Sequence, residues 1–108
     1  MFSSRGPTME PMRYRYEFEQ ALPMEEIEAT LHLAIVAAES VFGSSTVRMD
    51  AQYSIDEPRR ICVVDASSEV GRCICQIFTG YLTREFGASA FRVRPTGSRE
   101  PVMAGGSA

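Results

Sequence analysis

The side chains best suited to metal binding or acid–base chemistry in this chain of 108 residues are one histidine and three cysteines. His32 lies in a segment whose apolar residues recur at helical spacing, and Glu28 and Glu39 fall on the same side of that helix, one and two turns away. Such carboxylates stabilise a charged imidazole, and with a further ligand they would hold a metal ion. All three face away from the apolar side. We therefore interpret His32 as a solvent-exposed side chain and predict no metal site.

Cys73 and Cys75 are spaced like a chelating pair, but a step of two residues on a helix rotates the side chain by about 200°. They should point apart, and we interpret them as cysteines at the edge of the core, because a free cysteine packs like a small apolar residue. Cys62 is expected beneath the same helix. A Cys62–Cys73 bridge is geometrically conceivable. However, three cysteines without regular spacing predict no disulfide framework and suit the cytoplasm.

Four polar residues lie where a strand is expected to lead into a helix: Asp65, Ser67, Ser68 and Glu69. A serine nucleophile needs a base beside it, and the only histidine belongs to the other helix. Ser67 or Asp65 can instead cap the helix, with Glu69 in its first turn. We predict no catalytic residue and no cofactor, and we favour a protein that is not an enzyme.

The segment from about 12 to 19 alternates apolar and charged residues, which predicts a strand with one dry face and one charged face. Tyr14, Tyr16 and Phe18 alternate there with Arg13, Arg15, Glu17 and Glu19. A helix is expected from Pro23 to about 42, with Gly43 ending it. A second alternating segment, from about 46 to 55, predicts another strand. On it, Val47, Met49, Ala51, Tyr53 and Ile55 alternate with Arg48, Asp50, Gln52 and Ser54.

The remaining pattern predicts a strand at 60–66, a helix that ends at Gly87 and a strand at 91–94 stopped by Pro95. This β-α-β-β-α-β order is that of the α+β ferredoxin-like sandwich, a four-stranded antiparallel sheet with two helices on one face. The right-handed crossover rule predicts the strand order 4-1-3-2. We expect one domain over 12–95, with flexible tails at 1–11 and 96–108 because both are rich in Gly, Ser and Pro.

The face of the sheet without helices would carry the arginines of strands one, two and four. On strand three we place Ile61 and Val63 outward, because Asp65 shares their face and is costly to bury. An apolar strip rimmed by charges is typical of a small interface. The expected binding residues are Arg13, Arg15, Arg48, Ile61, Val63, Arg92 and Arg94. Three alternatives remain: arginine stems cover the strip, a second copy binds it, or an anionic ligand or nucleic acid does.

Bulk composition narrows the possible partners. A net charge of -3 and a pI near 5.1 argue against a general nucleic-acid binder. No apolar run approaches the roughly 20 residues of a membrane helix, and no signal peptide is apparent, so we expect a cytoplasmic protein without membrane contact.

Leu33 and Val36 fall near the solvent side of the first helix and form a second apolar surface. We predict a binding or assembly module that self-associates as a dimer through its sheet face or this helix surface, with a further protein partner also possible. The alternative is a small enzyme or ligand sensor that binds an anionic small molecule on the arginine-lined face.

Overall fold

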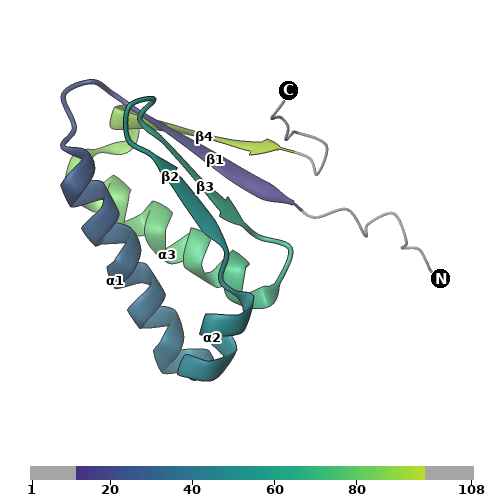
Figure 1. Ribbon diagram of the computed structural model, residues 1–108. Coiled ribbons are helices and arrows are strands. Elements are labelled where there is room, and N and C mark those ends of the chain that lie inside the picture. Colours follow the sequence, from purple (N-terminus) through teal and green to yellow (C-terminus); the bar gives the residue numbers. More distant parts are fainter. Residues whose placement is uncertain (1–11, 97–108) are drawn as a thin grey trace.

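The structure, a computed structural model, describes residues 12–96 (Figure 1). Its elements are β1 (Arg13–Phe18), α1 (Met24–Phe42), α2 (Ser44–Asp50), β2 (Tyr53–Asp56), β3 (Ile61–Asp65), α3 (Glu69–Phe86), a 3-10 turn (Ala88–Ala90) and β4 (Phe91–Thr96). The last strand runs through Pro95 to Thr96, one residue beyond the predicted domain end. The expected tails otherwise lie outside the described residues.

The four strands form one antiparallel sheet in the order β2-β3-β1-β4. Counted from the β4 edge, this is 4-1-3-2, with β1 and β3 in the middle. The two long helices, α1 and α3, lie beside each other on one face of the sheet (Figure 1). The protein is thus an α+β fold with a four-stranded antiparallel sheet and three helices in the described part.

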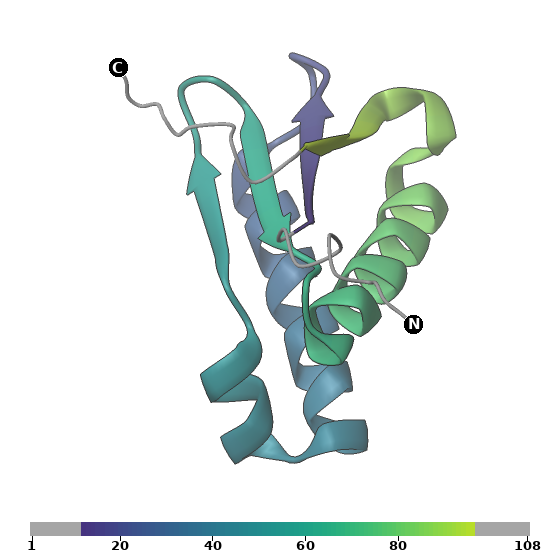
Figure 2. The same cartoon turned by 90° about the vertical axis from the view of Figure 1, so that its right-hand side faces the viewer.

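The prediction of a strand over 46–55 is wrong for its first half. Residues Ser44–Asp50 form α2, which leads from the carboxyl end of α1 into β2 (Figure 2). Gly43, at a φ of 89°, turns the chain between the two helices. Val47 is buried, as expected. Met49 is 78% exposed and Tyr53 44% exposed, so the prediction that these two belong to the core is wrong. Within Ser44–Asp50 the spacing of Val47 and Met49 also fits a short helix that buries only Val47, and α2 packs against α1 here.

The other element boundaries follow local signals. α1 ends at Gly43 and α3 at Gly87, as predicted, and both glycines have positive φ. The cap of α3 is Ser68 rather than Ser67 or Asp65: its Oγ accepts a hydrogen bond of 3.0 Å from the Gly71 amide. Asp65 instead accepts one of 2.9 Å from the Ser67 amide, which holds the turn before the helix.

The core lies between the sheet and the two long helices. Tyr16 is fully buried at its centre, with the Phe78 ring centroid 4.8 Å away. Six residues of the first and third strands were predicted to face inward. Tyr16, Phe18, Cys62, Val64 and Ala66 are buried, and Tyr14 is half-buried. Ile27, Leu31, Ile74 and Leu82 fill the space from the helix side.

Candidate functional site

The sheet face opposite the helices carries the charged side chains of β1 and β4, as predicted. In the register of the sheet, Arg15 pairs with Val63 on one side and Arg94 on the other, and Glu17 pairs with Ile61 and Arg92. Arg13 pairs with Asp65 and Thr96. Four of the five predicted arginines therefore lie together on this face: Arg13, Arg15, Arg92 and Arg94.

Glu17 is the acidic centre of that cluster. Its Oε2 lies 2.6 Å from Arg94 Nη2 and 3.1 Å from Arg15 Nε. The hydrogen bond from Arg94 lowers the pKa of Glu17. Desolvation opposes this shift, and the charges of Arg94, Arg15 and Arg92 add to it. The carboxylate thus lies in a positive local field, although the whole chain is acidic.

Ile61 and Val63 point to this face, as predicted, but both are only half-exposed. Their cross-strand neighbours are Arg15 and Glu17 on β1 and Ser54 and Asp56 on β2. Since long side chains on neighbouring strands shield apolar surface with their stems, the apolar strip is less accessible than the sequence pattern suggests.

Arg48 does not belong to the sheet face. It lies in the last turn of α2 and is exposed there, because residues 44–50 are helical instead of extended. Asp50, the last residue of α2, leaves the predicted face for the same reason. Gln52 lies beyond α2 and lines a hollow with Arg13, Val63 and Asp65 of the sheet. The sheet-face site is therefore smaller than expected.

The outer face of α1 presents more apolar surface than the sheet. Leu33 is 59% exposed and Val36 57% exposed, which confirms the predicted second apolar surface. Val41, near the end of α1, and Met49, on α2, are also largely exposed and were not foreseen. The exposure of Val41 could have been predicted, because Val41 lies in the last turn of the helix and beside its buried stripe. The exposure of Met49 was missed because residues 46–55 were predicted to form a strand with Met49 on its inner face.

His32 and the three cysteines are the side chains that the sequence analysis considered for metal binding or acid–base chemistry. His32 is exposed, and its Nε2 lies 3.5 Å from the Tyr53 hydroxyl, a contact that was not predicted. Among residues 12–96 there is no group of three or more His, Cys, Asp or Glu placed to hold a metal ion.

The three cysteines are free. Cys62 lies beneath α3 as predicted, and burial raises the pKa of its thiol to about 12. Cys75 was expected at the edge of the core but is buried, and burial raises its pKa to about 11. Cys73 is half-buried on the same helix. Two buried thiols that keep their protons are poor nucleophiles and poor metal ligands.

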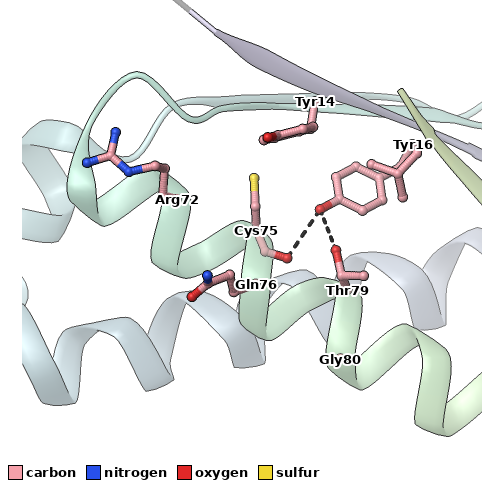
Figure 3. Close-up of a pocket in the computed structure, with 8 residues that line it drawn as sticks. Tyr14, Tyr16, Arg72, Cys75, Gln76, Thr79 and Gly80 are labelled. Carbon is pink, nitrogen blue, oxygen red and sulfur yellow. Dashed lines mark hydrogen bonds between the residues drawn. The ribbon is translucent and has the colours of Figure 1, made fainter. Parts of the chain in front are cut away.

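One cavity went unpredicted (Figure 3). It has a volume of about 480 Å³ and lies between α3 and the side chains of Tyr14 and Val93 on β1 and β4. The Tyr16 hydroxyl lies at its inner wall, 2.8 Å from Thr79 Oγ1, and donates to the Cys75 carbonyl at 3.3 Å. A glycine in mid-helix, Gly80, was the one sequence signal that marks it.

No family model matches the chain, and neither the curated proteins nor the solved structures contain a match. No helix within the described residues has both the length and the apolar character to cross a bilayer.

Proposed function

We propose that this protein is a non-enzymatic assembly module that pairs with a second copy of itself through the outer face of α1. The observation that carries the proposal is the exposure of Leu33 and Val36, one turn apart on the middle of a helix. Adjacent large apolar side chains in water are a recurrent sign of a protein interface.

The packing around these two side chains suits a second helix. Leu33 is the midpoint of Met24–Phe42, so a two-fold axis near it lets two copies of α1 cross with the greatest overlap. Small side chains surround the pair on the same surface, which allows close approach of a partner helix: Ala29, Ala37 and Ser40. An antiparallel crossing also sets opposite ends of the helix dipoles against each other.

The other surfaces are less suited to self-association. Ile61 and Val63 are half-covered, and the charged groups around them are paired through Glu17. The edges of the sheet are protected: β2 has four residues, and β4 carries Pro95 and two exposed arginines.

We also propose the ferredoxin-like sandwich as the fold, with α2 as an added helix. Without α2 and the 3-10 turn, the element order is β-α-β-β-α-β, and α1 and α3 share one face of the sheet. Three free cysteines support a reducing compartment, the cytoplasm.

Light scattering on the full chain tests the association. We expect a particle larger than 12.0 kDa. Val36→Glu and Leu33→Glu should each shift it toward monomer without loss of the fold, because both side chains are exposed and a buried carboxylate at the interface is costly. Thr83→Glu, on the exposed surface of α3, is the matched control and should leave the size unchanged.

The same measurement separates the two surfaces. If Val63→Glu rather than Val36→Glu produces monomer, the interface is the sheet face. If the wild-type chain is monomeric at high concentration, the proposal is wrong.

A second candidate function is the binding of an anionic small molecule on the arginine-lined face, as a sensor or small enzyme. The observation that favours it is the clustering of four arginines, Arg13, Arg15, Arg92 and Arg94, at neighbouring positions of β1 and β4. Titration with inorganic phosphate, followed by amide NMR shifts on β1 and β4, tests it. Arg92→Gln should reduce those shifts, whereas Arg59→Gln in the β2–β3 turn should not, and an absence of shifts on both strands would exclude phosphate as a ligand.

A further inference from the structure

The cavity beside α3 arises because the helices do not fully cover the sheet near β4. Val93 pairs with Tyr16 in the β1–β4 register and so points to the helix side of the sheet, yet it is 37% exposed. Tyr14, on the same side of β1, is also accessible at its edge. An apolar side chain on the inner face of a sheet is normally covered by a helix, whereas Val93 lines the cavity.

Gly80 keeps the floor of that space low. It lies inside α3, where glycine costs stability relative to alanine. Packing does not require it, since a Cβ built at Gly80 meets no other atom within 4 Å. This contrasts with Gly71 on the same helix, where a Cβ would clash with the backbone of β3. Gly80 lines the cavity, so its lack of a side chain leaves the cavity deeper at this point.

The lining of the cavity carries a single charge, which is positive. Arg72 is the only ionised side chain in the lining at neutral pH, and no carboxylate is part of it. Within residues 12–96 the Arg72 guanidinium makes a single long hydrogen bond, 3.5 Å from Nη1 to the Ala66 carbonyl. Gln76 lies one turn from Arg72 on the same helix, also in the lining. By contrast, the Tyr16 hydroxyl is already paired with Thr79 and the Cys75 carbonyl.

We propose that this cavity binds a small carboxylic acid with an apolar body. The carboxylate pairs with Arg72 and Gln76, and the body lies against Tyr14 and Val93 above Gly80. A volume of about 480 Å³ is within the range of small-molecule sites, and a mostly apolar wall with a few polar groups at one end is their usual composition. This site is separate from the α1 surface and does not depend on self-association.

Octanoate and octanol, one charged and one neutral, are the probes. We expect octanoate, added to the ¹⁵N-labelled full chain below its micelle-forming concentration, to shift the amide signals of Arg72, Gln76, Gly80 and Val93. Octanol should bind about tenfold more weakly, because it lacks the charge that Arg72 would pair with. Arg72→Gln should remove this difference, whereas Arg84→Gln, in the last turn of the same helix, should keep it.

Gly80→Leu tests the floor of the cavity. The open space at Gly80 admits the larger side chain, so the variant should fold and lose the octanoate shifts. Gly80→Ala should raise the Tm and should weaken octanoate binding less than Gly80→Leu does. It replaces Gly80→Leu in the binding test if the leucine variant does not fold. The proposal is overturned if octanoate and octanol bind alike, if Gly80→Leu leaves binding unchanged, or if the same amide signals shift on dilution alone, which would mark an interface between copies.

Discussion

Single residues in the core keep their ionisable groups neutral. The Tyr16 hydroxyl is enclosed by Thr79, the Cys75 carbonyl and the Phe78 ring, and desolvation raises the pKa of Tyr16 far above its usual value. The Cys62 and Cys75 thiols are shifted in the same direction by the same cause. The core is therefore stable as long as these three groups keep their protons.

This protonation makes the fold sensitive to alkaline pH. Below pH 9 the thiols are protonated in both the folded and the unfolded chain, so their full contribution to stability is present. As pH rises above 9, the unfolded chain loses these protons first and the free energy of unfolding falls, until the folded pKa of about 12 for Cys62 is passed. We expect each thiol to lower the free energy of unfolding by about 1.4 kcal/mol at pH 10 relative to pH 7.

Urea unfolding at pH 7 and pH 10 measures this loss. Cys62→Ala should be less stable at pH 7 but lose less stability on going to pH 10. Val64→Ala removes a buried neighbour on the same strand without a titrating group, so it should show the wild-type pH dependence. Equal pH dependence in all three proteins would contradict the assignment of the loss to the thiol.

Between elements, the β2–β3 turn is tied to the β1–α1 loop by one arginine. Arg60 has a φ of 60°, and its guanidinium donates to the Glu19 carbonyl at 3.1 and 2.8 Å and also to the Leu22 carbonyl. Its own carbonyl accepts from the Phe18 amide at 3.1 Å. The planar fork of arginine reaches two carbonyls at once, which an ammonium does less well.

Arg60→Lys should therefore destabilise the domain although it keeps the charge. We expect a loss of about 1–2 kcal/mol, the range for hydrogen bonds from a charged donor. Arg59→Lys is the control, since the Arg59 side chain is exposed and its one ion pair within residues 12–96 is a surface contact of 3.7 Å with Asp56. Thermal unfolding of both variants measures the difference, and equal Tm values would show that the Arg60 contacts do not hold the loop.

The junction of β3 and α3 depends on one glycine. A Cβ at Gly71 would lie 3.0 Å from the Asp65 carbonyl carbon and closer still to its oxygen, and backbone atoms cannot move aside cheaply. Gly71→Ala should destabilise by about 3 kcal/mol. Gly80→Ala should stabilise by about 0.5–1 kcal/mol, because a Cβ there meets no other atom within 4 Å. Chemical denaturation should give opposite signs for the two variants, and a shared sign would contradict the packing at Gly71.

The elements were predictable where one periodicity extended over the whole segment. The stripe of α1 and the alternation of β1 each repeat several times, so their facing was clear. Residues 46–50 continue the alternation of the strand that follows, yet they are helical. Val47 and Met49 also fit a short helix that buries only Val47 and packs against α1. Ser67 and Ser68 likewise have the same capping chemistry, and only the path of the chain decides between them.

The site was harder to predict than the fold, for a physical reason. A face of a strand follows from the period of two, so Arg13, Arg15, Arg92 and Arg94 could be placed together. A cavity depends on how far each helix reaches beneath the sheet, which no local pattern records. A glycine inside a predicted helix, Gly80, indicates an unusual position but does not show that a cavity lies next to it.

For the whole molecule, two long helices cover one face of four strands and leave two apolar surfaces to water. One is the cavity near β4, which is concave and fits a small molecule. The other is the outer face of α1, which carries Leu33 and Val36 on a convex helix and fits a second chain. Of the two proposals, only self-association through the second surface would make stability depend on protein concentration, because association stabilises the folded chain by mass action.

The Tm of the full chain should therefore rise with its concentration. In the range where the dimer is the main species, each tenfold increase adds about 0.7 kcal/mol per protomer, half of the tenfold value for one association. For a domain of this size that corresponds to a rise of about 3–5 °C. Val36→Glu should abolish the dependence and match the wild-type Tm at high dilution, since the exposed side chain adds nothing to the isolated fold. A wild-type Tm that stays constant over a hundredfold range of concentration would show that the outer face of α1 is not an interface between copies.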